Sequence, residues 1–106
     1  MHYLVTARLK PGSASAFRAE LTDGSIARQK PDGAEIVASM ERAAVKPDGT
    51  VEWSEVCYCS PPLAHERETV YDRFFDHMSI APAAGYAEHS GRRFLDWLDE
   101  RAGRPA

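Results

Sequence analysis

The dipeptide Asp48-Gly49 lies between two runs of strand-forming residues, and this feature limits most strongly how the chain can fold. Asp-Gly between such runs is a strong signal for a β-hairpin, because both residues tolerate the positive φ angles that tight turns need. The sequence therefore predicts a strand over residues 34–45, a turn over residues 46–50 and a strand over residues 51–59.

The charged residues of the two runs indicate which positions face each other. A loop with an even number of residues sets Arg42 opposite Glu55, whereas an odd loop sets Glu41 opposite Glu55. Opposite charges on facing positions add about 0.2–1 kcal/mol, and like charges there are unfavourable. We therefore expect the even loop, with an Arg42–Glu55 pair across the hairpin.

Local patterns predict the other elements. Alternating apolar residues indicate strands, and apolar residues that recur every three or four positions, such as Val70 and Phe74, indicate helices. Proline, glycine and serine mark the boundaries. The resulting elements are a strand over residues 2–9, a helix over residues 14–28 that breaks or kinks at Asp23-Gly24, a helix over residues 65–78, a weak strand over residues 83–89, a helix over residues 91–102 and a frayed tail over residues 102–106.

The order of these elements is β-α-β-β-α-β with an extra C-terminal helix. This order is the split βαβ pattern of ferredoxin-like folds. Such folds belong to the α+β class and carry their helices on one face of an antiparallel sheet. The length of 106 residues suits one domain over residues 1–106.

The opposite face of that sheet would be too apolar to stay in water. Under the expected register it carries Leu4, Val37, Val45, Val56 and Tyr58. Contiguous apolar patches of this kind usually mark an interface, and two-fold dimers are the commonest oligomers. The sequence therefore predicts a homodimer that buries this face.

The element order, the chain length and the opening strand His2–Leu9, followed by Lys10-Pro11-Gly12 and a helix, resemble the small dimeric α/β-barrel superfamily. This superfamily includes cofactor-free monooxygenases of antibiotic biosynthesis, muconolactone isomerases, YCII-related proteins and ligand-sensing domains of some bacterial regulators. The resemblance extends over about residues 1–90 and concerns topology, so it transfers no catalytic residue. It implies a dimer with a ligand-sized cavity between sheet and helices or between the two sheets.

Composition and charge argue against several classes of partner. The chain has 13 Lys and Arg against 16 Asp and Glu, a formal net charge of -3. Nucleic-acid binders need a basic surface to displace phosphate counterions. No run approaches the roughly 18 apolar residues of a membrane span, and the N-terminus lacks the regions of a signal peptide. We therefore expect a cytoplasmic protein that binds neither nucleic acid nor membrane.

The metal-ligating residue types show no spacing typical of a metal site. Cys57 and Cys59 would share one face of a strand about 7 Å apart at their Cα atoms, too far for a disulfide. A CxC half-site for a metal would need two more ligands, and the chain has no second cysteine pair. His65 and His77 would lie three turns apart on one helix. The sequence therefore predicts free thiols, no metal and no cofactor.

A ligand in the expected cavity would meet the polar residues of the mixed sheet face. Tyr58 could donate a proton or stabilise an enolate, Glu41 could act as a base if burial raised its pKa, and His89 would lie near the cavity mouth. These three are the candidate catalytic residues. The candidate ligand-binding residues are Arg8, Thr6, Ser39 and His77. The alternative is structural, with Arg8 and Glu41 pairing with each other.

Three functions fit this architecture. The first is an enzyme without a prosthetic group that isomerises, cyclises or oxygenates a small organic molecule. The second is a non-catalytic dimer that binds or senses such a molecule, and the third is a structural or protein-interaction module. The fold does not choose among them. A cavity lined by several polar groups would favour the first two, and a strongly shifted pKa there would favour the enzyme.

Overall fold

The chain folds around a five-stranded antiparallel sheet with the strand order β4-β1-β3-β2-β5. The structure is a computed structural model that describes residues 1–103. The strands are β1 (His2–Leu9), β2 (Ala44–Val45), β3 (Val51–Val56), β4 (Phe75–Ala83) and β5 (Arg92–Arg93). The helical segments are α1 (Ala14–Thr22), α2 (Gly33–Arg42), α3 (Ala64–Glu66), the π-helical η1 (Arg67–Tyr71), α4 (Asp72–Phe74) and α5 (Phe94–Ala102). Within residues 1–103, none of the helices combines the length and apolar character that a membrane crossing requires.

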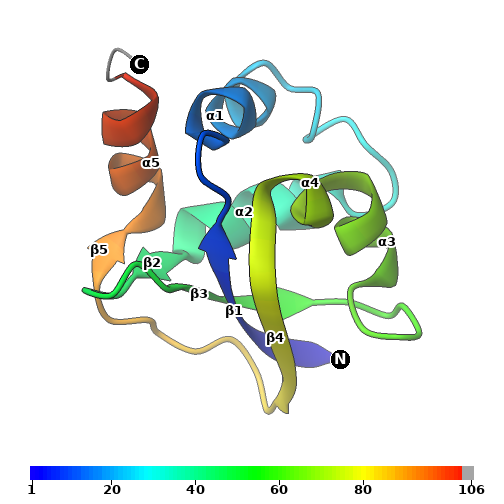
Figure 1. Ribbon diagram of the computed structural model, residues 1–106. Coiled ribbons are helices and arrows are strands. Elements are labelled where there is room, and N and C mark those ends of the chain that lie inside the picture. The colour runs from blue at the N-terminus through cyan, green and yellow to red at the C-terminus, as the bar shows by residue number, and fades with distance from the viewer. Residues whose placement is uncertain (104–106) are drawn as a thin grey trace.

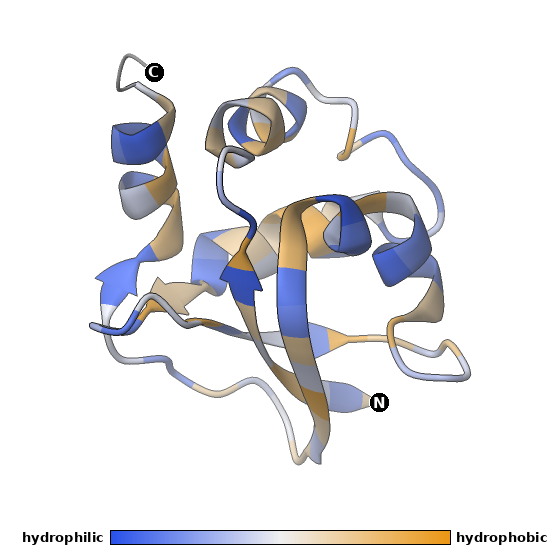
Figure 2. Cartoon of the chain, in the orientation of Figure 1, coloured by the Kyte–Doolittle hydropathy of each residue, from blue (hydrophilic) through white to orange (hydrophobic). Residues whose placement is uncertain are grey.

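One face of the sheet is buried under helices. On the neighbouring strands β1 and β3, Val5 faces Trp53 and Ala7 faces Val51, and all four side chains are buried. Figure 1 shows α1, α2 and α4 gathered on one side of β1 and β4. In Figure 2 hydrophobic and hydrophilic residues alternate along the helices, as expected of elements with one buried face.

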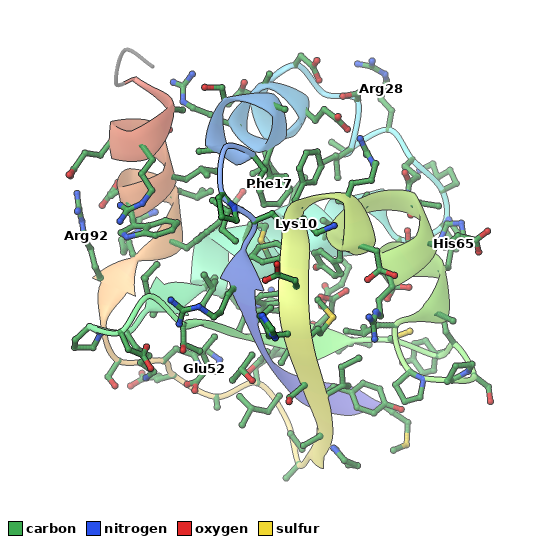
Figure 3. The ribbon with its side chains drawn as sticks, viewed as in Figure 1. Lys10, Phe17, Arg28, Glu52, His65 and Arg92 are labelled. Carbon is green, nitrogen blue, oxygen red and sulfur yellow. The ribbon has the colours of Figure 1, made fainter. Side chains whose placement is uncertain are left out.

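Aromatic side chains fill the space between the two layers. The ring of Phe17 stacks on that of Phe74 with centres 4.6 Å apart, and Phe75 lies 5.2 Å from the ring of Trp53. Figure 3 shows Phe17 pointing from α1 into the interior. Aromatic pairs at such distances add about 0.5–1.5 kcal/mol beyond the burial of their area. The cluster therefore joins α1, the end of α4 and the middle of β3.

The opening strand and the hairpin turn are confirmed. β1 spans the predicted residues 2–9. The turn forms over residues 46–50, where the Lys46 N–H donates to the Thr50 carbonyl at 2.8 Å. Gly49 has a φ of 90°, a left-handed conformation that glycine adopts without steric cost.

The predicted strand over residues 34–45 is wrong, because most of this segment forms α2. Ile36, Ser39 and Met40 are buried, and their spacing of three and four residues is that of one helix face. Alternation of apolar residues fits the same segment, so its pattern is ambiguous between the two periods. Only Ala44–Val45 form a strand.

The expected register of the hairpin is also wrong. Ala44 faces Glu52, which is the register of an odd loop. Arg42 lies in α2 and pairs with Glu35 at 3.0 Å instead of with Glu55. The charge argument fails because one of its two residues is not on a strand.

Side chains of α2 make the hydrogen bonds that the missing strand would have made. β2 is too short to pair with the second half of β3. At this free edge the Val56 N–H donates to the Glu35 carboxylate at 2.9 Å, and the Ser54 carbonyl accepts from Arg42 at 2.9 Å. The Ser39 hydroxyl lies 3.5 Å from the same carbonyl. Because buried backbone groups need partners, these bonds fix α2 beside the edge.

The helix predicted over residues 65–78 ends earlier, and the strand predicted over residues 83–89 does not form. The helical segments end at Phe74, and Phe75–Ala83 form β4, which pairs with β1. β4 is an edge strand of the sheet, a position that tolerates Pro82. Pairing with β1 therefore outweighs the helical spacing at the end of this segment.

The end of β3 and the start of α5 also differ from the prediction, because β3 ends at Val56 and Arg92–Arg93 form β5. α1 ends at Thr22, directly before the break expected at Asp23-Gly24. Gly24 follows α1 with a φ of 87°, a conformation that does not continue a helix. The fraying predicted for residues 102–106 falls mostly on residues 104–106, which lie outside the described residues.

The second face of the sheet is partly covered by residues 84–91, which join β4 to β5 (Figure 1). On this face the ring of His2 lies 4.9 Å from that of Tyr86. Val45 is buried in the core and Val37 lies on α2. Neither valine therefore belongs to the exposed apolar patch that the sequence predicted.

The C-terminal helix is confirmed over Phe94–Ala102, and two of its leucines test how it packs. Leu98 is fully buried, whereas Leu95 is only partly buried. We expect Leu98→Ala to lower the free energy of unfolding by about 2–5 kcal/mol and Leu95→Ala to lower it by clearly less. Urea denaturation followed by tryptophan fluorescence measures both changes. Equal losses would contradict the observed orientation of α5.

Candidate functional site

The predicted site residues do not converge on one cavity. Glu41 and Ser39 were expected on a sheet face, but both lie in α2, where Glu41 is exposed and Ser39 is buried. Their placement on the sheet was therefore wrong. Tyr58 follows β3 and is 88% exposed at the mouth of a pocket.

The predicted ligand-binding residues outside α2 also lie apart. Thr6 and Arg8 are on β1, and Arg8 donates to the Thr50 hydroxyl at 3.5 Å. His77 lies at the β-bulge of β4 with a φ of 54°, and its side chain is 77% exposed. Neither Thr6 nor His77 lines the pocket that Tyr58 borders.

His89 belongs to a chain of three hydrogen-bonded side chains on the covered sheet face. Its Nε2 lies 2.7 Å from the Ser54 hydroxyl, and its Nδ1 lies 2.8 Å from the Glu52 carboxylate. The hydrogen bond from His89 is the main reason why the pKa of Glu52 is lowered. Active-site serines use the same order of groups, but Ser54 is only 1% exposed and already accepts the Ala87 N–H at 3.0 Å. The chain therefore fastens residues 84–91 to the sheet.

A pocket of about 550 Å³ opens between the start of α2, the end of β3 and Tyr86. This volume suits a small organic molecule, because ligand pockets typically measure about 300–1,000 Å³. Carboxylates, thiols and two tyrosines form its walls. The lining residues are Pro31, Asp32, Glu35, Val56, Cys57, Tyr58, Cys59, Glu66 and Tyr86.

Glu35 fixes one wall of the pocket. Its Oε2 atom accepts hydrogen bonds from the Val56 N–H at 2.9 Å and from Arg42 at 3.0 Å. The Tyr86 hydroxyl donates to the same atom at 3.1 Å, and the Arg42 guanidinium lies 4.2 Å from the centre of the Tyr86 ring. Burial, together with Glu35, raises the pKa of Tyr86. These contacts hold the tyrosine over the pocket.

Thiols and a carboxyl group gather at the inner end of the pocket. Glu66 is 1% exposed and accepts a hydrogen bond from the Cys59 thiol at 3.3 Å. The sulfur of Cys57 accepts the Cys59 N–H at 3.1 Å. Burial and the neighbouring Cys59 side chain raise the pKa of Cys57 to about 12. Cys57 is therefore a neutral thiol at neutral pH.

Asp32 and His65 form an ion pair beside Glu66. The Asp32 Oδ2 lies 2.6 Å from the His65 Nδ1, and Figure 3 shows His65 at the outer side of the short helices that follow β3. Burial raises the pKa of Asp32, but hydrogen bonds, the one from His65 first, outweigh it and leave the pKa lower than usual. The same hydrogen bond raises the pKa of His65. A carboxylate that orients an imidazole in this way is suited to proton transfer.

A fully buried carboxyl group lies behind this cluster. The Oε1 of Glu55 accepts hydrogen bonds from the Tyr71 hydroxyl at 2.6 Å and from the Trp53 indole at 2.8 Å. Its Oε2 has no partner in the described part of the chain. Burial outweighs these hydrogen bonds and, with the charge of Glu66, raises the pKa of Glu55 to about 8. Glu55 is therefore mostly protonated at neutral pH.

Sequence reasoning missed most of this pocket. Cys57 and Cys59 were expected on one strand, but the strand ends at Val56 and the following turn brings both thiols toward Glu66. Asp32 and Glu66 were not among the candidate residues. The CxC pair was the one available signal, because the other groups come from distant parts of the chain.

A second pocket, of about 620 Å³, lies near the start of α1. Arg8, Lys10 and Arg101 border it together with Trp97. All three cations have partners in the protein. Arg8 donates to the Thr50 hydroxyl at 3.5 Å, Lys10 donates to the Asp72 carbonyl at 2.6 Å, and Arg101 lies 3.6 Å from the Trp97 ring centre. This pocket is therefore a weaker candidate, for an anionic ligand.

Comparisons with protein-family models, with curated protein sequences and with solved structures found no match.

The raised pKa of Glu55 predicts how stability depends on pH. A carboxyl with a higher pKa in the folded than in the unfolded chain lowers the free energy of unfolding as pH rises between the two values. With 4.5 as the ordinary value and about 8 in the folded chain, stability should fall over this interval. Glu55→Gln cannot titrate there, so its unfolding free energy should fall less steeply than that of the parent.

Urea denaturation at a series of pH values measures this difference. Glu41→Gln, at an exposed position of α2, is the matched control and should follow the parent curve. Parallel curves for the parent and Glu55→Gln would show that Glu55 is ionised in the folded chain at neutral pH.

Proposed function

We propose that this protein binds a small organic molecule with a positively charged group in the pocket under Tyr86. The observation that carries the proposal is the gathering of Asp32, Glu35 and Glu66 around one pocket of about 550 Å³. His65 and Arg42 pair with the first two carboxylates, whereas Glu66 has no ion pair within residues 1–103. The pocket therefore favours a cation and repels an anion.

Two tyrosines suit the remainder of such a molecule. Tyr58 is 88% exposed and Tyr86 is 51% exposed, and both line the pocket. Aromatic faces attract cations by about 0.5–1 kcal/mol at exposed sites and pack against flat rings. Their exposure supports a role in binding, because large aromatic residues are otherwise mostly buried.

Acid–base catalysis on the bound molecule is the second candidate function, and the Asp32–His65 pair favours it. The 2.6 Å contact with His65 holds the Asp32 carboxylate in one orientation at the pocket wall, as a group that transfers protons requires. Proton transfer of this kind would serve the isomerisation or cyclisation expected from the sequence. The proton-transferring residue would then be Asp32, which lines the pocket, in place of Tyr58, Glu41 and His89.

The arrangement of the sheet supports a ferredoxin-like domain of the small dimeric α/β-barrel type. The order β4-β1-β3-β2 with antiparallel neighbours is the order that such a domain requires. The outer edge of β4 is unpaired in the described chain. Leu4 is 36% exposed on the face of the sheet that points away from the helices. We propose that a second copy of the chain covers this region in a homodimer. The cytoplasmic location stays a prediction.

Ligand charge is the sharpest test of the binding proposal. Benzylamine and benzoate share one ring and carry opposite charges at neutral pH. We expect benzylamine to shift the amide NMR signals of Cys57, Cys59 and Tyr86, and benzoate to leave them unchanged. Asp32→Asn should weaken benzylamine binding about tenfold, or about 1.4 kcal/mol. Asp96→Asn, at an exposed position of α5, is the control.

Equal shifts with benzoate would contradict the charge preference. Shifts confined to the basic pocket at Arg8 and Trp97 would place the ligand elsewhere and contradict the choice of pocket.

Sedimentation equilibrium tests the homodimer separately. At micromolar concentration we expect the mass of two chains, because a second copy would cover Leu4 and the free edge of β4. A charged substitution on this face, Leu4→Lys, should shift the equilibrium toward one chain. A parent protein with the mass of one chain throughout would contradict the dimer but not the pocket.

A further inference from the structure

We propose that the inner end of the pocket binds one Zn²⁺ ion, with the thiolates of Cys57 and Cys59 and the carboxylate of Glu66 as protein ligands. The inference deepens the proposed function, because it shares that pocket and names a cation for its inner end. It does not require the organic molecule. It reverses the expectation from the sequence, which found no second cysteine pair and therefore predicted no metal.

The three side chains already lie close to the spacing of a metal site. One ligand atom from each lies within 4.8 Å of the other two, and the Cys59 sulfur is 3.3 Å from the Glu66 carboxylate. Around a tetrahedral zinc ion with bonds of about 2.0–2.3 Å, neighbouring ligand atoms lie about 3.3–3.8 Å apart. Side-chain rotations therefore suffice to reach this geometry.

The backbone presents these groups from two separate elements. Both cysteines come from the turn after β3, where the Cys59 N–H bonds to the Cys57 sulfur at 3.1 Å. Glu66 ends α3, where the Arg67 N–H donates to the Leu63 carbonyl at 2.8 Å and closes the helical turn. Glu66 is 1% exposed and Cys57 is 4% exposed, so neither can turn away into solvent.

A cation would balance the charge at this place. Glu66 has no Lys or Arg partner within residues 1–103, and the carboxyl group of Asp32 interacts with it directly. A buried carboxylate is stable only when it is paired, hydrogen-bonded or bound to a metal. The Cys59 thiol donates to Glu66 at 3.3 Å and the Cys57 thiol interacts with it as well, but thiols are weak donors that compensate little of the charge.

The donor set selects zinc among the common divalent ions. Thiolates are soft ligands that favour zinc, whereas magnesium and calcium take oxygen ligands alone. Three protein ligands leave a fourth position, which is the pattern of catalytic zinc sites. Asp32 lies beside this position, and its 2.6 Å contact with His65 holds it there. Groups around a metal site are often held by hydrogen bonds in this way. A molecule in the pocket would then reach the metal.

Cobalt substitution tests the site in the full chain. The protein is stripped with a chelator, kept reduced with a phosphine and titrated with Co²⁺. We expect one ion per chain, with thiolate-to-cobalt charge-transfer absorption and the visible bands of a tetrahedral site. Zn²⁺ should displace the cobalt and remove the bands. Absence of charge-transfer absorption would overturn the proposal.

Two variants identify the ligands. Cys59→Ser changes a half-buried atom, and Glu66→Gln keeps the side-chain shape. Each should lower the affinity for Zn²⁺ by more than about 100-fold, beyond the 10–100-fold cost of losing an outer partner. Glu41→Gln is the matched control and should bind as the parent does. Near-ultraviolet circular dichroism of the stripped variants verifies their folding. Unchanged affinity in folded Cys59→Ser would also overturn the proposal.

The two proposals fail in different ways. Benzylamine binding depends on Asp32 and the tyrosines, so the stripped parent protein should bind benzylamine without any metal. If the parent protein binds benzylamine but does not bind cobalt, the metal site alone is refuted. If the parent protein binds cobalt through thiolates but benzylamine shifts none of its amide NMR signals, the proposal of an organic ligand alone is refuted.

Discussion

The free edge of β3 is the constraint on which the rest of the structure depends. β2 pairs only with the beginning of β3, so the backbone groups of Ser54 and Val56 need other partners. Arg42 and Glu35 of α2 supply them at 2.9 Å each. Leaving a buried donor or acceptor without a partner costs about 1–3 kcal/mol. These bonds therefore set both the position and the direction of α2.

The pocket is a consequence of this replacement of a strand by a helix. The Cys57 N–H still donates to the Met1 carbonyl at 3.0 Å, and the chain then leaves the sheet in a turn that brings Cys57 and Cys59 toward Glu66. Glu35 serves both purposes, since the carboxylate that completes the edge of β3 also lines the pocket. The acidic character of the site thus arises from groups that the fold needs for its own hydrogen bonds.

The fold could be predicted from the sequence where its signals are local. The strand over residues 2–9 and the turn at Gly49 depend on alternation and turn chemistry, and both are confirmed. Ile36 and Met40 fit a strand and a helix equally well, and the choice depends on which neighbour buries them. The end of the helix at Phe74 likewise depends on the pairing of the next residues with β1. The candidate site was predicted less well, because only Tyr58 among its named residues borders the main pocket.

The sequence by itself determined the α+β class, the first strand and the hairpin turn. These follow from side-chain size, hydropathy and turn propensity, which act over a few residues. Only the tertiary structure decided that residues 33–42 form a helix, and only it brought Asp32, Cys57 and Glu66 to one pocket. The physical reason is that burial and hydrogen-bond satisfaction depend on neighbours far along the chain, and local preferences cannot specify those neighbours.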